Sequence, residues 1–395
     1  MRDFADLPIT MIGHPWAPIG MGEQMRSHIA AATAVHLHHR VFDIFRYAQR
    51  VDPAHAAIVA PLEREDLPGG VRIFHINGDE VERVLEAFAA RGGDFKSGYN
   101  IIIPAWELPH YPAAWAPALA KFDEVWAISA FTQSALAKAG IPSHLIGQAI
   151  EGPPGALLPR RHFAIRESAY MILNFFDLSS YASRKNPEAV LTMFDRLRAA
   201  HPFRDLLLVL KVKNGERGAE EWAETVASDP QIKVLSTPLD TLGVRSLINA
   251  SDCFVSLHRA EGFGRGLGEA MALGRLAMGT GWSGNVDFMT AENSLLVGHS
   301  VRALAPGDYP FGEGQSWVEP DIDHACALLS PVLADASRGA AIARHGQFEA
   351  LKSHGNRAVG VRILKRIEAI AAGLAQSAAS REARVTPKSR AKTRK

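Results

Sequence analysis

Two carboxylates flank a glycine-rich run in the stretch EGFGRGLGE, from Glu261 to Glu269. An apolar, strand-like segment, Cys253 to Leu257, stands before it, and a segment of helical composition, Gly268 to Leu273, follows it. A strand, a Gly-rich turn and a helix together present backbone N–H groups and a helix N-terminus to a phosphate. Carboxylates make strong hydrogen bonds with hydroxyls. Phosphate in the middle and hydroxyls at both ends describe a nucleotide sugar; the alternative is a strand-to-helix turn with solvated glutamates.

The wider context SLHRAEGFGRGLGEAMALG, followed by GTGWSGNVDF, resembles the retaining glycosyltransferases of family 4, the group 1 glycosyl transferases. That family has the two-domain GT-B fold, and the order of the chain from about Met11 to Leu374 fits it. The resemblance implies transfer of a hexose-type sugar from a nucleotide diphosphate sugar to a glycan or glycolipid acceptor. We expect that no metal or other cofactor is needed, because a cation pair and a Gly-rich helix entrance can stabilise the leaving diphosphate instead.

The resemblance further implies roles along the motif. Matched by position, Glu269 binds the nucleotide ribose and Glu261 contacts the hydroxyls of the donor sugar. Arg265 opens the following helix, where it either adds charge near the diphosphate or faces solvent. Little side-chain obstruction lets backbone amides approach the sugar and the distal phosphate. The residues expected to do so are Gly262, Phe263 and Gly264.

A second cationic motif, SRKNP, runs from Ser183 to Pro187 and contains Arg184 and Lys185. Two adjacent cations at a helix entrance can neutralise a leaving diphosphate without a metal. Lys185 matches the lysine of the resembled family. The family's arginine position is held here by Asp177 or Leu178, so either Arg184 takes its place or the contact is absent.

The N-terminal half holds the remaining candidates. A loop with Gly20 and Gly22 follows the first predicted strand, and the resemblance implies that it faces the donor phosphates across a cleft. It lacks the full GxGxxG pattern, and turn chemistry alone would also explain it. The segment PAWELPHYPAAW combines aromatic faces with polar groups, which suits a sugar acceptor. There Trp106 is expected on the acceptor side, with either Glu107 or His110 doing the polar work; the alternative is a proline-broken corner.

Metal sites are not expected. The HLHH run at 36–39 lacks cysteine or acidic partners at ligand spacing. The DxD at Asp321–Asp323 follows a proline and starts a predicted helix, so helix capping explains it better.

Composition limits the remaining choices. The chain has 395 residues, 47% of them hydrophobic, a net charge of +1 and only two cysteines. The length predicts two domains of ordinary size, and the low cysteine count is typical of a protein in the reducing cytosol. The net charge near zero predicts no nucleic-acid partner. No secretory segment and no apolar run of membrane-spanning length occurs, so any membrane role would be peripheral, at the inner face. Residues 381–395 carry seven basic residues and one acid, which suits either a solvated end or an anionic membrane surface.

Alternating strand and helix patterns predict an α/β protein with mostly parallel sheets covered by helices on both faces. The resemblance implies the GT-B arrangement, in which two Rossmann-like, doubly wound parallel-sheet domains face each other. It also implies that the acceptor-side domain, expected at 1–155, is completed by a crossover helix at about 356–374. A nucleotide-sugar domain follows at 156–355, and a disordered basic tail at 376–395. Among the predicted elements are a helix at 131–139 capped by Ser129, helices at 187–200 and 220–227, a linker at 152–155 and an irregular loop at 306–317.

Two other readings stay open. The chain could be another GT-B enzyme, such as an epimerase or a phosphorylase, although no pyridoxal-binding lysine context is identifiable. It could also be a catalytically silent binding subunit of a polysaccharide assembly complex, because the Trp106–Glu107–Leu108 and Asp177 positions depart from the family pattern.

Overall fold

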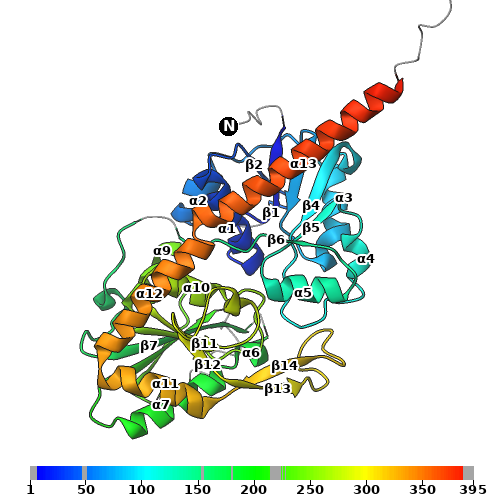
Figure 1. The fold of residues 1–395 in the computed structure, drawn as a ribbon. Coiled ribbons are helices and arrows are strands. Elements are labelled where there is room, and N and C mark those ends of the chain that lie inside the picture. The colour runs from blue at the N-terminus through cyan, green and yellow to red at the C-terminus, as the bar shows by residue number, and fades with distance from the viewer. Residues whose placement is uncertain are drawn as a thin grey trace, which may run out of the picture.

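In the computed structural model, two six-stranded parallel sheets form the two halves of the molecule (Figure 1). The structure describes residues 7–46, 51–152, 155–178, 181–213, 224, 226 and 228–385, with the backbone alone for 377–385. The centre of the predicted linker and most of the helix predicted at 220–227 lie outside the described residues.

The first sheet has the order β2-β1-β3-β4-β5-β6. Its strands are β1 (Ile9–Gly13), β2 (Arg40–Asp43), β3 (Gly70–Phe74), β4 (Gly98–Ile102), β5 (Glu124–Ala127) and β6 (His144–Leu145). Its helices are α1 (Gly20–Ala34), α2 (Pro53–Val59), α3 (Val81–Ala90), α4 (Ala116–Leu119) and α5 (Ala130–Lys138), with short 3₁₀ turns η1 (Gly78–Glu80) and η2 (Phe95–Ser97).

The second sheet has the order β12-β11-β10-β7-β8-β9. Its strands are β7 (Tyr170–Asp177), β8 (Leu206–Lys213), β9 (Ile232–Leu235), β10 (Cys253–Ser256), β11 (Leu276–Thr280) and β12 (Leu295–Val297). The associated helices are η3 (Arg160–Phe163), α6 (Ala182–Lys185), α7 (Pro187–Ala200), α9 (Thr241–Ala250), α10 (Arg265–Ala272), η5 (Gly284–Asp287), α11 (Ile322–Ala334) and α12 (Ala336–His354).

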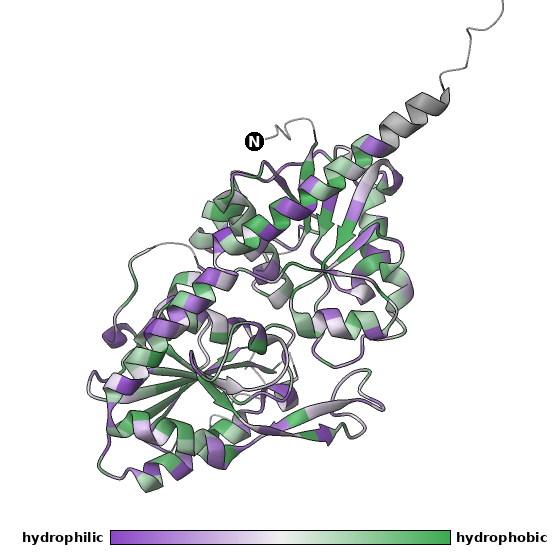
Figure 2. Ribbon diagram, in the orientation of Figure 1, coloured by the Kyte–Doolittle hydropathy of each residue, from purple (hydrophilic) through white to green (hydrophobic). Residues whose placement is uncertain are grey.

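Apolar residues on both faces of the strands explain why helices cover both sides of each sheet. Along β7, Met171 and Leu173 belong to one hydrophobic cluster and Ile172 to another. Strands of a parallel sheet are buried on both faces, so they lack the polar alternation of a half-exposed strand. Figure 2 shows the apolar strands inside and the polar residues on the outer helices. The predicted α/β fold class is confirmed.

Local signals set several helix ends where the sequence predicts them. Ser129 caps α5, because its hydroxyl accepts a hydrogen bond from the Thr132 N–H. Pro187 occupies the first turn of α7, whose bounds match the prediction. Asp321 caps α11 by accepting from the His324 N–H, which confirms its capping role.

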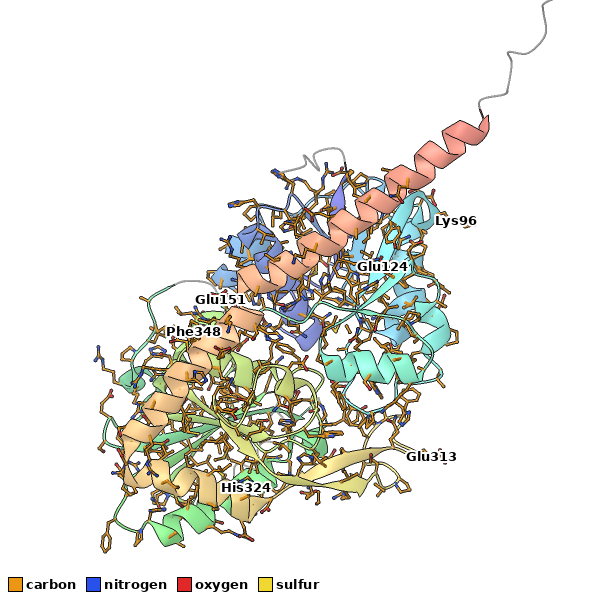
Figure 3. The ribbon with its side chains drawn as sticks, in the orientation of Figure 1. Lys96, Glu124, Glu151, Glu313, His324 and Phe348 are labelled. Carbon is orange, nitrogen blue, oxygen red and sulfur yellow. The ribbon has the colours of Figure 1, made fainter. Side chains whose placement is uncertain are left out.

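The last helix, α13 (Asn356–Val385), returns from the second half to the first and packs against α1 (Figure 1). Arg366 on this helix donates from Nε to Glu124 of β5 at 2.9 Å, and Glu124 is labelled in Figure 3. The helix continues ten residues into the stretch predicted as a disordered tail. That prediction relied on the lack of large apolar residues, whereas the alanine-rich sequence has high helix propensity.

The irregular loop predicted at 306–317 connects the two strands of a β-hairpin that was not predicted, and only its last two residues belong to a strand. The hairpin consists of β13 (His299–Ala303) and β14 (Ser316–Pro320), paired antiparallel. Figure 1 shows it projecting from the second half towards the part of the molecule that carries α5, and Figure 3 labels Glu313 at its tip.

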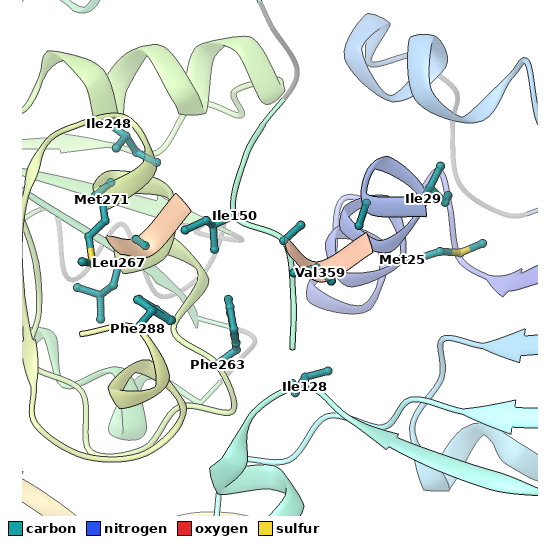
Figure 4. Packing of buried hydrophobic residues seen from close by; sticks show 14 of the residues in the cluster. Met25, Ile29, Ile128, Ile150, Ile248, Phe263, Leu267, Met271, Phe288 and Val359 are labelled. Atoms are coloured by element: carbon teal, nitrogen blue, oxygen red, sulfur yellow. The ribbon is translucent and has the colours of Figure 1, made fainter. Parts of the chain in front are cut away.

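Hydrophobic packing is continuous between the two halves. One cluster contains Met25 and Ile29 of α1, Ile128 and Ile150 of the first half's loops, and Phe263 of the Gly-rich turn. Figure 4 shows these side chains lying between the two sheets. The Gly-rich turn is therefore fixed by packing against the opposite half as well as by its own sheet.

Among the described residues, no single helix combines the length and apolarity needed to cross a bilayer. The helix pair Ile322–Ala334 and Ala336–Gln376, bent by 111°, passes that test only when taken together, by length and composition alone.

Candidate active site

The topology of the second sheet brings the two donor motifs to one crevice. The chain runs from β7 to β8 and β9 on one side, and then to β10, β11 and β12 on the other. In open α/β sheets such a switch point leaves a crevice at the carboxyl ends of the strands. Arg184 and Lys185 lie just beyond β7, and Glu261 lies just beyond β10.

A cavity of about 2060 Å³ lies at this crevice and is lined from both halves. Pockets for drug-sized ligands measure about 300–1,000 Å³, so this one has room for a nucleotide sugar and part of a second substrate. The predicted site residues that line it are Gly20, Glu107, Arg184, Lys185, Glu261, Gly262, Phe263, Gly264, Arg265 and Glu269.

The Gly-rich turn aims the N-terminus of α10 into the cavity. Gly264 caps the helix at a φ of 86°, and an added Cβ would lie 2.8 Å from the Asn285 Cβ. Only glycine meets both conditions without strain. Arg265 and Gly266, the first two helical residues, line the cavity. The helix N-terminus thus supplies unpaired N–H groups and a positive dipole end.

Residues at the start of α5, in the first half of the molecule, donate hydrogen bonds to the Gly-rich turn and to η5 of the second half. The Ser129 hydroxyl donates to the Gly262 carbonyl at 2.5 Å, and the Ala130 N–H donates to Asp287 Oδ2 at 2.8 Å. The carbonyl of Gly262 therefore has its hydrogen-bond partner in the other half of the molecule.

Glu261 forms a buried ion cluster with both predicted cations. Lys185 Nζ donates to Glu261 Oε1, and Arg184 Nη1 lies 3.2 Å from Glu261 Oε2. Burial acts to raise the pKa of Glu261, but the charges of Lys185 and Arg184 outweigh it and hold the pKa at about 2. Burial lowers the pKa of Lys185, against the opposing attraction of Glu261.

Glu107 adds a second carboxylate to this cluster. Its Oε1 lies 3.7 Å from Arg184 Nη2, and its Oε2 accepts a 2.9 Å hydrogen bond from the Tyr309 hydroxyl. Arg184 thus lies between a carboxylate of each half, Glu107 and Glu261. Both raise its pKa more than burial lowers it, so the guanidinium stays charged.

Glu269 has a different environment at the other end of the motif. Its Oε1 pairs with Arg265 Nη2 at 2.7 Å. Burial raises the pKa of Glu269; Arg265 opposes the rise, and the nearby Glu23 adds to it. Glu23 itself pairs with Arg26 at 2.6 Å.

Sequence reasoning missed a polar bridge that also lines the cavity. Asp52 caps α2, and its Oδ2 accepts hydrogen bonds from the N–H and the hydroxyl of Thr241, at 2.9 and 2.6 Å. Thr241 is the first residue of α9 in the other half. The Asp52–Pro53 pair signals a helix start, but nothing local indicates its second partner, 189 residues away.

Three of the predicted site residues, Trp106, His110 and Gly22, are not among the described residues that line the cavity. Trp106 is 3% exposed and belongs to a core cluster, so its ring is no open platform for a sugar. His110 receives a hydrogen bond from Trp106 Nε1 at its carbonyl, and its N–H donates to Gln315. Gly22 lies inside α1, where an added Cβ would meet the Ala17 carbonyl at 2.1 Å. Gly20 and Gly22 form helix rather than loop.

In the part of the chain that the structure describes, no group of three or more His, Cys, Asp or Glu side chains is arranged to hold a metal ion.

No protein-family model matches this sequence, and no curated protein matches it either. Solved structures do match. Anabaena Alr3699/HepE in complex with UDP and glucose aligns with a TM-score of 0.62 at 14% identity, over 92% of this chain and 100% of that chain. Sucrose-phosphate synthase (tll1590) from Thermosynechococcus elongatus aligns with a TM-score of 0.62 at 15% identity, over 93% and 100%. An Escherichia coli protein described as trehalose-6-phosphate, bound with UDP-2-fluoro glucose, gives 0.59 at 10% identity, over 91% and 98%.

These similarities show the fold: two facing Rossmann-like sheets in the GT-B arrangement. Identities of 10–15% show the fold alone, so membership of family 4 within it stays a prediction.

Proposed function

We propose that this chain is a retaining, metal-independent glycosyltransferase that moves a hexose-type sugar from a nucleotide diphosphate sugar to a glycan or glycolipid acceptor. The observation that carries the proposal is the Lys185–Glu261–Arg184 cluster beside the N-terminus of α10, with Glu269 in the same cavity. Similar folds bind UDP with glucose, or UDP-2-fluoro glucose, which makes a UDP-sugar the first donor to test.

The charges suggest how the leaving group is stabilised. Two cations and two carboxylates, Glu261 and Glu107, leave the cluster locally neutral before the donor binds. When a diphosphate enters, Lys185 and Arg184 supply positive charge to it, and Glu261 turns its oxygens to the sugar hydroxyls. The α10 dipole adds to this stabilisation, so the protein itself supplies the charge that a metal provides elsewhere.

The other predicted site residues would contact the rest of the donor and the acceptor. Glu269 would hold the ribose hydroxyls, and the backbone of Gly262, Phe263 and Gly264 would approach the phosphate and sugar. Glu107 would face the acceptor. The protein would act in the cytoplasm, with its basic C-terminal residues drawing it to the inner membrane face.

The test is release of UDP from UDP-glucose by the purified chain, in EDTA and in Mg²⁺, with a panel of glycan acceptors. We expect equal rates in both media and a product whose anomeric configuration is that of the donor, read by NMR. Complete loss of activity in EDTA that returns with Mg²⁺ would contradict metal independence. Tight UDP binding without turnover of any nucleotide sugar would favour a silent binding subunit.

A further inference from the structure

The β13–β14 hairpin is bonded to both halves of the candidate site. At its base, Glu319 accepts from Arg259 Nε at 2.8 Å, and the Arg259 N–H donates to the Arg184 carbonyl at 2.7 Å. Near its tip, Gln315 Oε1 accepts from the His110 N–H at 2.9 Å. The hairpin therefore connects the turn that carries the two cations with the predicted acceptor corner.

Aromatic residues gather where the hairpin meets that corner. Tyr309 lies 4.9 Å from Tyr181 and 5.9 Å from Trp106, measured between ring centroids. Phe311 lies 5.0 Å from Trp115 in an edge-to-face arrangement. Trp106 is buried beneath the group and supports it.

Two members of this group combine exposure with an unusual backbone. Tyr181 is 48% exposed at a φ of 57°, and Phe311 is 47% exposed at a φ of 54°. Bulky residues adopt positive φ at a cost of about 1 kcal/mol or more. Tyr181 and Phe311 both adopt this unfavourable backbone conformation, and both have an aromatic ring that is partly exposed to water. We name Tyr181, Tyr309 and Phe311 the aromatic rim.

One hydrogen bond connects the aromatic rim with a residue that lines the cavity. The Tyr309 hydroxyl donates to Glu107, and Glu107 lines the cavity 3.7 Å from Arg184. Burial raises the pKa of Tyr309, and Glu107 raises it further, so the phenol stays a neutral donor. The rim is therefore one hydrogen bond away from a carboxylate beside the cation cluster.

We infer that the aromatic rim binds a pyranose ring of the acceptor, and that the hairpin sets which glycan reaches the cavity. This inference rests on the proposed function. A sugar ring offers apolar C–H faces to aromatic rings and hydroxyl edges to polar groups, and here Glu107 is the polar group. The neighbouring hairpin tip carries Glu313, which would disfavour an anionic lipid surface at this place.

The test uses saturation-transfer NMR with methyl glycosides of glucose, galactose and N-acetylglucosamine, in the presence of UDP. We expect ring-proton signals with the wild type for at least one glycoside. Phe311→Ala and Tyr181→Ala should lower its apparent affinity by about threefold to tenfold, because each removes one stacking face. Phe348→Ala is the matched control, since Phe348 is 64% exposed on α12, well away from Glu313 in Figure 3.

Absence of any glycoside signal with the wild type, or equal signals in all variants, would overturn the inference. It would also be overturned if Phe311→Ala weakened sedimentation with anionic vesicles and left the glycoside signals unchanged. Calorimetric UDP binding and hydrolysis of UDP-glucose, measured on the same proteins, report the donor site separately. The proposed function fails if the wild type neither binds UDP nor cleaves UDP-glucose, whereas the inference fails if donor chemistry persists without any effect of the rim variants. Thermal melts show whether each variant is folded.

Discussion

The two ends of the Glu-x7-Glu motif line one cavity, yet they shift the pKa of their glutamates in opposite directions. Burial acts to raise the pKa of both. At Glu261 the bonded cations Lys185 and Arg184 reverse the effect. At Glu269 the attraction of Arg265 and Arg245 is opposed by Glu23 and does not overcome burial. We call the Glu261 end the sugar end and the Glu269 end the nucleotide end, after their proposed roles. Burial alone therefore does not decide the direction of the pKa shift; the balance of the neighbouring charges does.

The difference has a chemical meaning for a glycosyltransferase. In the proposed mechanism, Lys185 and Arg184 stabilise the charge that develops on the leaving diphosphate, so changes at the sugar end should affect bond breaking. The proposed role of Glu269 is to accept ribose hydroxyls, so changes at the nucleotide end should affect binding in ground and transition states alike. Only contacts that strengthen in the transition state raise the rate of the chemical step.

The largest expected effect is on turnover at the sugar end. Lys185→Ala removes one of the charges that stabilise the leaving diphosphate, and we expect transfer from UDP-glucose to fall by about 10²–10³-fold. UDP release under saturating donor measures it. Lys352→Ala, an exposed change on α12, should leave the rate unchanged. A loss smaller than that caused by Glu269→Ala would reverse the comparison between the two ends.

The next effect is on nucleotide affinity. Glu269→Ala removes a charged acceptor worth about 1.5–3 kcal/mol, so UDP should bind about tenfold to a hundredfold more weakly. Isothermal calorimetry measures this directly. Glu261→Gln should not weaken UDP binding, because free UDP has no sugar to contact this residue and the loss of its charge leaves Lys185 and Arg184 available to the diphosphate. Transfer should nevertheless fall steeply. Equal losses of UDP affinity in both variants would contradict the division into two ends.

A smaller effect should appear with pH. The pKa of Glu269 is raised, so this group takes up a proton at a higher pH than an ordinary glutamate. Protonation weakens its acceptance of ribose hydroxyls, so UDP affinity should be intact above the raised pKa and fall as the pH drops through it. The phosphates of UDP also titrate, so the quantity to measure is the ratio of wild-type to Glu269→Gln affinity. A ratio independent of pH would show that the nucleotide end does not titrate.

The sequence predicted those parts of the site that are local. The order strand, Gly-rich turn and helix places Glu261, Gly264 and Arg265 within five residues, and the structure has β10, the turn and α10 in that order. Ser129 was predicted as the cap of α5, because capping depends on neighbours three residues away.

Contacts between distant segments had no comparable signal. The partners in the Lys185–Glu261 pair lie 76 residues apart, and those in the Tyr309–Glu107 bond 202 apart. The hairpin was missed because all five residues of β13 are exposed, so they show no apolar alternation. Trp106 was expected to face the acceptor, and only the tertiary structure shows that its ring is buried against Tyr309 and Phe311 of the segment that connects the hairpin strands.

The smallest expected effect on UDP affinity and transfer comes from removing the C-terminal residues. Figure 1 shows α13 extending beyond the first sheet, and none of the described residues after Asn356 lines the cavity. Truncation after Ala375 should therefore change neither UDP affinity nor transfer to a soluble acceptor. Residues 381–395 carry seven basic residues and one acid, and each basic residue near an anionic surface contributes about 1 kcal/mol. Truncation should therefore reduce sedimentation with anionic vesicles, most at low salt, where screening is weakest. Equal sedimentation of both proteins at low salt would leave these residues a solvated end, and altered UDP affinity would tie them to the nucleotide end after all.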